Sequence, residues 1–477
     1  MSARYLTTTI PYVNAEPHIG FALELVQADA LARARRLAGD EVFFSTGADE
    51  HGQKIYDAAK KAGQEPQAYA DHYAAEVQKL KDALHLSTDA FIRTTDPAHI
   101  KAAQEMWHRC ATKGDIYKKA YTGLYCVGCE LFKTEKELID GKCPLHPNLT
   151  PEKISEENYF FRFSKYQKEL LAYLEHPEVI TPDWRRAEAI AFVKGGLEDF
   201  SISREKKRFS WGIPIPDDDS QIMYVWFDAL TNYLSTLGWP EDAGGNFKKF
   251  WEEGTTLQVA GKDQVRFQSL MWQAMLMSAD IKNTDRVFYH GFITSGGQKM
   301  SKSLGNVISP FDVVQKYGTD AIRYMLLRHV HPTEDSDVTW ERLDEWYTAN
   351  LTNGLGNLVA RVMKLAEDNQ VVSIDVHSNR RTSLESNVVN AVSNFEFNEA
   401  MNHIWSAIQR LDRKITEEEP YKLVKTDLVL GKVAIQFLVN EIREIAKALM
   451  FFMPHTSEKI LVAIRENKKP DNLFPRL

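Results

Sequence analysis

Strand-like and helix-like segments alternate in two stretches of this sequence, and this alternation most constrains the fold. Residues 4–10 (RYLTTTI) and 40–46 (DEVFFST) are typical of strands, and the amphipathic segment 17–39 between them is typical of a helix. The same order recurs as strand, helix and strand at 255–261, 266–279 and 286–292. Because connections of this length join parallel strands, the sequence predicts an α/β fold with a doubly wound parallel sheet.

A different pattern follows residue 350. Long helical periods at 357–368, 397–415 and 430–452 predict an α-helical bundle. A chain of 477 residues has room for roughly three domains of about 150 residues each. A sheet domain, a bundle and a further segment between the two halves of the sheet would account for this length.

Composition narrows the class of protein. The sequence is 44% hydrophobic and 26% charged with a formal net charge of −8, which indicates a globular protein without a strongly basic surface. Residues 351–477 hold 17 Lys and Arg against 16 Asp and Glu, so this part tolerates a polyanion better than the rest. We see no apolar core of a signal peptide and no apolar run of the roughly 18 residues that span a membrane. The four cysteines favour a reducing cytoplasm.

Short polar motifs follow the strand-like segments. IPYVNAEPHIG (10–20) follows the first, GADEHG (47–52) the second, GKDQ (261–264) the third and GGQKMSKSLGN (296–306) the fourth. Carboxyl ends of parallel strands meet at one edge of a sheet, where ligands bind. We therefore expect the four motifs to form one site.

Two of these motifs suit a polyphosphate. His18 lies at the start of a helix, where unbonded N–H groups favour phosphate, and Gly20 leaves room for a base or ribose. Lys299 and Lys302 place two mobile cations on a loop whose glycines allow it to close. Each motif alone also fits a structural cap or a solvated basic turn. Their combination favours phosphate chemistry.

A zinc site is predicted between the two halves of the sheet. Cys126 and Cys129 form one pair with two residues between them, and Cys143 and His146 form a second. Thiolates and an imidazole with this spacing are typical of a tetrahedral Zn2+ site. Four protein ligands leave no position for water, so the spacing favours a structural zinc.

The motifs resemble those of a known family. KMSKS at 299–303 and HIGF at 18–21 resemble the two signatures of class I aminoacyl-tRNA synthetases, with Phe21 where a second histidine is common. The segments GLYCVGCE, NYFFR, MYVWFDALTNYL and GKDQVRFQSLMW are similar to methionyl-tRNA synthetases with one zinc. This resemblance is colinear over essentially the whole chain.

The resemblance implies a Rossmann-type catalytic domain, an inserted connective domain with a zinc knuckle at about 124–148, and a C-terminal helical anticodon-binding domain. The implied segments are 1–115 and 223–294 for the two catalytic halves, 116–222 for the insertion, 295–349 for the KMSKS loop and stem-contact region, and 350–477 for the bundle.

The resemblance also implies an activity. Methionine and ATP would form methionyl-adenylate and pyrophosphate, with Mg2+ on the ATP, and methionine would then pass to the terminal ribose of its tRNA. The implied catalytic residues are His18, Lys299 and Lys302. The implied ATP-binding residues are Asn14, His18, Gly20, Gly261, Asp263, Lys299 and Lys302. The implied methionine-binding residues are Ile10, Tyr12, Asp49, Trp226, Ala229, Leu230, Tyr233 and Gln268, with Asp49 facing the ammonium group. The implied anticodon-binding residues are Asn357, Arg361 and Tyr421.

The sequence departs from the common family pattern at a few of these positions. Gln264 stands where an apolar residue is common, Gln268 where histidine is common, and Tyr421 where tryptophan is common. A tyrosine can still stack on a base.

Alternatives remain within and outside this class. A cysteine-type synthetase is similarly short, but its family disperses its zinc ligands along the chain. The valine, isoleucine and leucine enzymes carry a large editing insertion, for which this chain has little room. An inactive RNA-binding relative and a small-molecule nucleotidylyltransferase are the other candidates. The expected partners are ATP, methionine and tRNA, without a membrane. Because no additional C-terminal tRNA-binding module is present, we expect a monomer.

Overall fold

The computed structural model describes residues 2–128, 131–133, 135–144, 148–300, 305–372 and 382–477. They form two compact units. The sheet unit comprises Met1–Pro17, Asp40–Lys79 and Thr88–His290, and the helical unit comprises His18–Gly39, Leu80–Ser87 and Gly291–Leu477. Both units are discontinuous in sequence. The five-segment division expected from the resemblance stays a prediction, because the two units are defined by compactness and the five segments by function.

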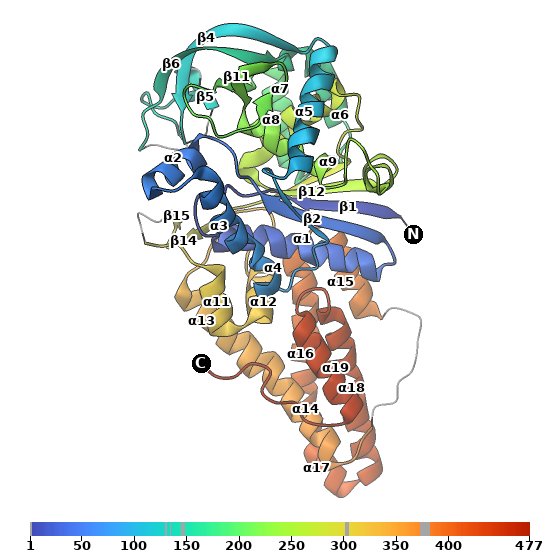
Figure 1. Ribbon diagram of the computed structural model, residues 1–477. Helices are drawn as coiled ribbons and strands as arrows, with labels where there is room; N and C mark the ends of the chain where they lie inside the picture. The colour runs from blue at the N-terminus through green and yellow to red at the C-terminus, as the bar shows by residue number, and fades with distance from the viewer. Residues whose placement is uncertain (1, 129–130, 134, 145–147, 301–304, 373–381) are drawn as a thin grey trace. The chain divides into compact units, whose positions relative to one another are not determined.

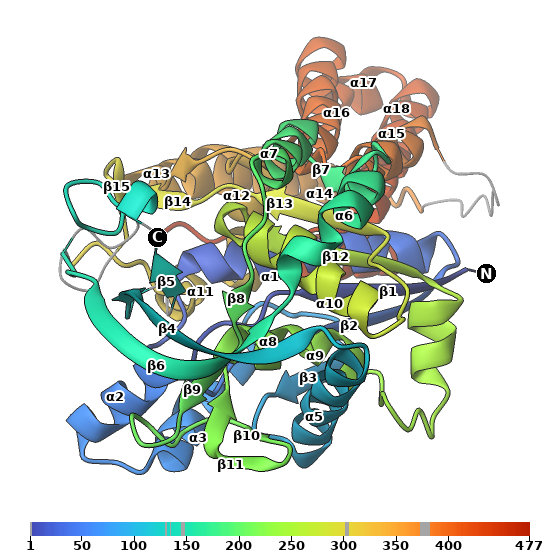
Figure 2. The same cartoon turned by 90° about the horizontal axis from the view of Figure 1, so that it is seen from above.

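Six parallel strands form the centre of the sheet unit, in the order β3-β2-β1-β12-β13-β7. Figure 1 labels β1, β2 and β12, and Figure 2 labels all six strands. Their bounds are β1 Ala3–Thr8, β2 Glu41–Ala48, β3 Ala90–Arg93, β7 Ile180–Thr181, β12 Thr255–Gly261 and β13 Arg286–His290. The chain adds β2 and β3 on one side of β1, and β12 and β13 on the other. The order therefore reverses between β1 and β12, and such a reversal is where α/β sheets bind ligands. The predicted α/β fold with a parallel sheet is confirmed.

Residues 116–223 add two antiparallel sheets to this unit. One has the order β5-β4-β6-β8 and the other β10-β11-β9. The bounds are β4 Ile116–Cys126, β5 Leu131–Lys133, β6 Glu152–Phe161, β8 Phe200–Ser201, β9 Ser203–Glu205, β10 Pro214–Ile215 and β11 Asp218–Met223. Figure 2 shows β4 and β6 as long, curved neighbours.

Helices pack around these sheets. Their bounds are α2 Gln53–Ala62, α3 Pro66–Gln78, α5 Pro97–Thr112, α6 Gln167–Leu174, α7 Asp183–Lys194, α8 Val225–Leu230, α9 Asn232–Ser235 and α10 Trp272–Ser278. The predicted helix at 266–279 differs in one respect. It is π-helical over Phe267–Met271 and α-helical only from Trp272. A π turn holds an extra residue, which is a frequent feature of functional sites.

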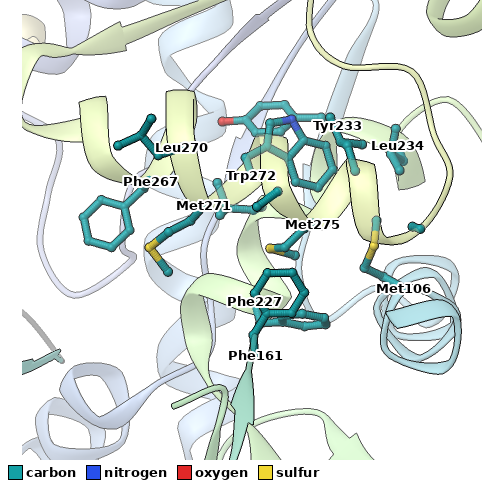
Figure 3. Close-up of a cluster of buried hydrophobic side chains, with 14 of the residues drawn as sticks. Met106, Phe161, Phe227, Tyr233, Leu234, Phe267, Leu270, Met271, Trp272 and Met275 are labelled. Atoms are coloured by element: carbon teal, nitrogen blue, oxygen red, sulfur yellow. The ribbon is translucent and has the colours of Figure 1, made fainter. Parts of the chain in front are cut away.

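The core of the sheet unit is rich in aromatic and methionine side chains (Figure 3). Phe161 and Phe227 pack together at a ring-centroid distance of 6.5 Å, and Tyr233 packs on Trp272 at 5.7 Å. Each buried aromatic ring removes a large apolar area from water. This packing fixes α8, α9 and α10 at the edge of the sheet that carries the polar motifs.

The helical unit contains α1 and the carboxyl-terminal part of the chain. Its helices are α1 Ile19–Leu37, α4 Leu80–Ala83, α11 Pro310–Tyr317, α12 Thr319–Arg328, α13 Trp340–Trp346, a π-helix Tyr347–Gly356, α14 Asn357–Asp368, α15 Ser383–Ser393, α16 Phe397–Glu418, α17 Pro420–Thr426, α18 Leu428–Leu449 and α19 Pro454–Glu466. A small sheet is formed by β14 Ile293–Ser295, β15 Gln298–Lys299 and β16 Ser336–Asp337. The predicted C-terminal helical region is confirmed.

A buried arginine explains why α1 and the segment 80–87 belong to this unit. Arg323 of α12 is fully buried and forms an ion pair of 2.7 Å with Asp29 of α1. It also donates to the carbonyls of Leu84 at 3.1 Å and Phe452 at 2.6 Å. A buried charge is stable only when it is paired and hydrogen-bonded, and this network joins four segments. Within the described part of the chain, no helix is long and apolar enough to cross a membrane.

Candidate active site

Backbone hydrogen bonds join the loops that follow β1 and β2. The amide of Val13 donates to the carbonyl of Asp49 at 3.1 Å, and the amide of Asp49 donates to the carbonyl of Pro11 at 2.9 Å. Tyr12 and Asp49 form an isolated parallel bridge. The sheet pairing thus continues beyond the strand ends and places the Asp49 carboxyl group, which is 3% exposed, beside Tyr12.

A second set of contacts fixes the residue after Asp49. Glu50 is fully buried, and its carboxylate accepts hydrogen bonds from Arg93 at 2.5 and 3.0 Å. Its amide donates to Thr94 at 2.9 Å, and its carbonyl accepts from the indole of Trp211 at 2.5 Å. The loop carrying Asp49 is therefore held rigidly from the β3 side.

Asp228 of α8 links this loop to two helices. It is fully buried, and each of its carboxylate oxygens lies 2.8 Å from a histidine nitrogen, His51 Nδ1 for one and His99 Nε2 for the other. His99 in turn lies 2.9 Å from Ser235 of α9. Burial raises the pKa of Asp228, but the histidines outweigh burial and leave its pKa below the ordinary value. The carboxylate is thus held in its charged form between two imidazoles.

An aromatic group lies on the other face of α8. Trp226 stacks on Phe267 with ring centroids 3.7 Å apart and meets Tyr12 edge-on at 6.2 Å. The hydroxyl of Tyr233 donates to Gln268 at 3.2 Å. Ala229 and Leu230 are buried nearby on the same helix. Among the described residues, Trp226 Nε1 and Gln268 Nε2 are buried donors without a hydrogen-bond partner.

Most of the predicted methionine-binding residues belong to this neighbourhood. Ile10 lies beside Gly47 of β2, since a Cβ at Gly47 would stand 3.1 Å from the Ile10 side chain. Figure 3 shows Tyr233 and Phe267 contributing to the same apolar cluster. A pocket with aromatic edges and an apolar floor suits a polarizable thioether.

In the loop after β12, the side chain of Asp263 lies close to the backbone of Gly261. A Cβ at Gly261 would lie 2.9 Å from the Asp263 carboxylate and 3.8 Å from the ring of His290. Gly261 pairs with His290 in the sheet register, so both stand at the carboxyl edge. Asn14 lies in the β1 loop, and its carbonyl accepts from Tyr69 at 3.1 Å.

His18 caps α1 in the helical unit. Its Nδ1 accepts a hydrogen bond from the Gly20 amide at 3.1 Å, so a neutral ring carries its proton on Nε2. Its pKa is lowered, first by burial and then by the charge of Lys299. The structure therefore brings His18 and Lys299 together, as the sequence predicted.

Lys299 lies at the end of β15. The turn before it has positive φ angles at Gly296 and Gly297, and β15 pairs with β14 at Thr294. Asn306 donates to the Lys299 carbonyl at 3.4 Å. Met300 also faces α1, since a Cβ at Gly20 would lie 3.9 Å from its terminal methyl group. Lys302 lies outside the described residues.

Two of the predicted zinc ligands are described. Cys126 ends β4, and Cys143 follows a tight hairpin in which Ile139 and Lys142 exchange two hydrogen bonds of 2.9 Å. Both cysteines are fully buried. Cys129 and His146 lie outside the described residues. Within the described ranges, no three potential ligands are grouped.

The predicted anticodon residues lie in the helical unit. Asn357 begins α14, and Arg361 follows one turn later and pairs with Asp412 at 2.7 Å. Tyr421 of α17 donates to Glu419 at 2.8 Å, which raises its pKa, and Arg361 is close enough to oppose that shift. The side chains of Arg361 and Tyr421 are both more than a third exposed.

Several residues of this site were missed by the sequence analysis. Asp228, His51, His99 and His290 are polar and at least nine-tenths buried. His51 and His290 lie in or beside the recognised motifs, which is a signal that could have drawn attention to them. Asp228 also lies in the recognised segment 223–234, whereas His99 lies in none, and the pairing of the two depends on contacts distant in sequence.

Comparison with known proteins gives consistent results. A family described as "tRNA synthetases class I (M)" matches residues 4–149 and 146–363. The chain is 41% identical over 471 residues to the methionine–tRNA ligase of Rhizobium meliloti, covering 96% of this chain and 90% of that protein. It is 39% identical over 484 residues to the methionine–tRNA ligase of Thermotoga maritima, covering 98% and 76%.

Solved structures show the same similarity. Mycobacterium tuberculosis methionyl-tRNA synthetase in complex with methionyl-adenylate superposes with a TM-score of 0.90 at 35% identity, covering 100% of this chain and 98% of that one. The apo form of that synthetase gives a TM-score of 0.81 at 31% identity, covering 100% and 97%.

Proposed function

The chain belongs to the methionyl-tRNA synthetase family of class I aminoacyl-tRNA synthetases and is a methionine–tRNA ligase, and from this premise we propose how its residues perform the reaction. The observation that carries the proposal is the contact between the start of α1 and the lysine segment, where the amide of Ile19 donates to the carbonyl of Ile308 at 3.0 Å and Met300 faces Gly20. The charge of Lys299 also lowers the pKa of His18. A cation and a helix amino terminus at one place suit a triphosphate. The similarity to methionine enzymes favours this function over a cysteine-type synthetase.

Methionine binds between Asp49 and the aromatic group of α8. Asp49 pairs with the ammonium, while Trp226, Tyr233 and Gln268 surround the thioether, with Ile10, Tyr12, Ala229 and Leu230 completing the pocket. The stack of Trp226 on Phe267 at 3.7 Å gives this pocket a rigid wall. The unbonded Gln268 amide supplies a donor where histidine is common in the family.

Gly261 and Asp263 bind the adenosine of ATP, and His18 binds its phosphates. Gly261 allows close approach of the base, Asp263 accepts from the ribose hydroxyls, and Gly20 and Asn14 line the same nucleotide. His18 donates from Nε2 to a phosphate oxygen, because its Nδ1 is already bonded to Gly20. Mg2+ carried by ATP adds charge neutralisation on the phosphates.

The first step needs no protein nucleophile. A methionine carboxylate oxygen attacks the α-phosphorus, and the bond to the bridging oxygen breaks, which releases pyrophosphate. Lys299 and Lys302 stabilise the charge that develops on this leaving group. A terminal ribose hydroxyl of the tRNA then attacks the methionyl carbonyl carbon. AMP leaves, and the hydroxyl proton passes to its phosphate. The similarity to a synthetase solved with methionyl-adenylate supports this intermediate.

Two further sites belong to the proposal. Cys126, Cys129, Cys143 and His146 bind one structural Zn2+, for which the burial of two cysteines beside tight turns is the support. Asn357, Arg361 and Tyr421 contact the anticodon, for which the exposure of Arg361 and Tyr421 in the helical unit is the support.

Pre-steady-state adenylate formation tests the roles of the lysines. We expect Lys299→Ala and Lys302→Ala to slow methionyl-adenylate formation by roughly 100-fold or more, in the range for losing one transition-state contact. Methionine affinity should change less than about threefold, because the lysines act on pyrophosphate. Lys316→Ala, which removes an exposed lysine of α11, is the control. Normal adenylate formation in both site variants would refute the assignment, and exchange of pyrophosphate driven by another amino acid would refute the methionine specificity.

A further inference from the structure

A cavity of about 340 Å3 lies in the sheet unit, outside the residues assigned above. One face of β4 lines it through Tyr117, Lys119 and Tyr121, and Phe132 of β5 and Phe160 of β6 lie beside them on the two neighbouring strands. Strand alternation places Lys118 on the other face of β4, where it pairs with Asp218 at 3.0 Å. The cavity therefore belongs to one face of the β5-β4-β6-β8 sheet.

Its walls suit a flat ring. Tyr121 lies edge-on to Phe132 with ring centroids 5.0 Å apart and to Phe160 at 5.6 Å. Tyr121 and Phe132 are only partly buried, so their faces are available to a ligand. Aromatic side chains arranged in this way bind unpaired nucleobases by stacking.

A buried cation lines the same cavity. Arg204 is 2% exposed, and one nitrogen donates to Ser201 Oγ at 2.9 Å and to the Ser203 carbonyl at 2.6 Å. Its Nε is buried without a hydrogen-bond partner, and within the described ranges the guanidinium forms no ion pair. Burying a charge without an opposite charge is unfavourable. The rings of Tyr125 at 5.1 Å, Phe132 at 5.2 Å and Tyr224 at 4.4 Å offset part of that cost, and an anionic ligand would stabilise the guanidinium further.

The other charges limit the size of that ligand. Lys119 and Lys133 add two cations, while Arg266 is already paired with Glu137 at 3.1 Å. Asp199 is satisfied by Tyr117 at 2.8 Å and Ser164 at 2.6 Å, and Glu198 remains as a negative charge. The excess of positive charge is small, which suits a single nucleotide better than a duplex.

The cavity adjoins the methionine site. Arg204 lies over the Tyr224 ring at 4.4 Å, two residues before Trp226. Arg266 lines the cavity and directly precedes Phe267, which stacks on Trp226. The cavity therefore lies beside the chain segments that carry Trp226 and Phe267, so a nucleotide bound in it would be next to the proposed methionine site.

We propose that this cavity binds the unpaired 3′-terminal nucleotide of the tRNA, with the base on Tyr121, Phe132 and Phe160 and the phosphate facing Arg204, Lys119 and Lys133. This inference rests on the proposed function, because it assigns a place to the nucleotide that receives methionine. Methionine activation does not require the cavity, since no tRNA takes part in that step. Transfer does require it.

Two variants and one control test the proposal. Tyr121→Leu keeps an apolar side chain but removes the ring, and Lys119→Ala/Lys133→Ala removes two cations. Both should lower kcat/KM for the tRNA by roughly tenfold or more, the loss expected for one stacking contact. Methionine-dependent ATP–pyrophosphate exchange should stay within about twofold of the unmodified protein in both. Lys118→Ala, on the opposite face of β4, should leave both activities unchanged.

A truncated tRNA gives the decisive comparison. With the unmodified protein, a tRNA that lacks its terminal nucleotide should inhibit aminoacylation more weakly than a tRNA that keeps this nucleotide but cannot be aminoacylated. With Tyr121→Leu the two inhibition constants should become equal. An unchanged ratio in this variant, or an equal loss of exchange and transfer, would overturn the proposal. Absence of methionine-dependent exchange in the unmodified protein would instead refute the proposed function.

Discussion

At the scale of single residues, Asp228 holds the two ends of the proposed methionine site at a fixed separation. Its carboxylate contacts His51, two residues after Asp49, and its helix carries Trp226 on another face. One end of the pocket meets the ammonium group, and the other meets the thioether. Asp228 therefore acts on methionine through other residues, as a positioning residue.

Asp228→Asn is expected to raise KM for methionine roughly tenfold and to change KM for ATP less than about twofold. An amide keeps the volume but offers only one oxygen, and an unsatisfied buried partner costs about 1–3 kcal/mol. Exchange kinetics at varied methionine and ATP measure the two constants. Asp115→Asn is the control, because Asp115 is also buried and accepts from Ser278 at 2.8 Å and Lys165 at 2.6 Å. Equal changes in both KM values, or the same profile in the control, would contradict a positioning role.

Individual residues of the site also differ in how far the sequence predicted their contacts. His18 and Lys299 lie in short motifs, and the segments that carry them meet where the amide of Ile19 donates to the carbonyl of Ile308 at 3.0 Å. Asp228 lies in the recognised segment 223–234 but His99 belongs to no motif, and the hydrogen bond between them joins α8 to α5 across 129 positions. A contact at that separation depends on how the core packs, which the order of the residues does not reveal.

At the scale of secondary-structure elements, the end of β4 and the hairpin at 139–142 present Cys126 and Cys143. We expect one zinc per chain in the purified protein, and less than about one half in Cys126→Ser or Cys143→Ser, because three remaining ligands bind zinc less tightly. Elemental analysis after dialysis measures the ratio.

Cys110→Ser is the matched control for this measurement. Cys110 lies in α5, and burial raises the pKa of its thiol to about 12, so it does not supply a thiolate. A full zinc content in the Cys126 and Cys143 variants, or a loss in the Cys110 variant, would show that the metal is bound elsewhere.

His329, the C-cap of α12, should make stability depend on pH. Its ring stacks on Trp346 at 4.4 Å and lies 2.9 Å from the hydroxyl of Tyr324. A helix carboxyl terminus favours a protonated histidine, but burial, and then the charge of Arg328, lower its pKa to about 4. In the unfolded chain the pKa is about 6.5, so only the unfolded state binds the proton between these values. Stability from this group is present above pH about 6.5 and is lost as the pH falls toward 4.

We therefore expect His329→Gln to lose less stability than the unmodified protein between pH 7.5 and pH 4.5. Urea unfolding at both pH values measures the difference in the free energy of unfolding. His72→Gln removes an exposed histidine of α3 and should behave as the unmodified protein does. A His329→Gln variant with the same pH dependence as the unmodified protein would show that the ring is not kept neutral by the fold.

Some secondary-structure elements could be predicted from the sequence, and the π turn before α10 could not. Strands and long helices were predictable because their apolar spacing repeats along the chain. The π turn at Phe267–Met271 was not, since a single extra residue leaves the apolar pattern of 266–279 helical. That turn carries Phe267 and Gln268, so the apolar spacing of the sequence could not predict the wall of the proposed methionine pocket.

At the scale of the whole molecule, one sequence supplies two discontinuous units. The segment 18–39 is close in sequence to β1 and β2 but packs with α12 through the ion pair of Asp29 with Arg323. Periodicity predicts a helix there without indicating its partner, because the apolar face of a helix fits many surfaces. Only the buried charges, which need a specific opposite charge, define that partner.

Recognition of the tRNA can be tested at Arg361 of α14, which lies far in sequence from the proposed methionine site. Arg361→Ala should lower kcat/KM for the tRNA by roughly 10-fold or more, because a charged hydrogen bond to a base contributes about 1–3 kcal/mol, while exchange should be unaffected. Lys364→Ala, in the same helix and paired with Asp368 at 2.5 Å, is the control.

A tRNA with an altered anticodon distinguishes a contact between Arg361 and an anticodon base from general attraction between Arg361 and the phosphates. If Arg361 contacts the anticodon, Arg361→Ala should cost much less with the altered tRNA, because the contact is already absent. An equal loss with both tRNAs would mean that Arg361 acts only through charge, and the anticodon assignment of α14 would then be wrong.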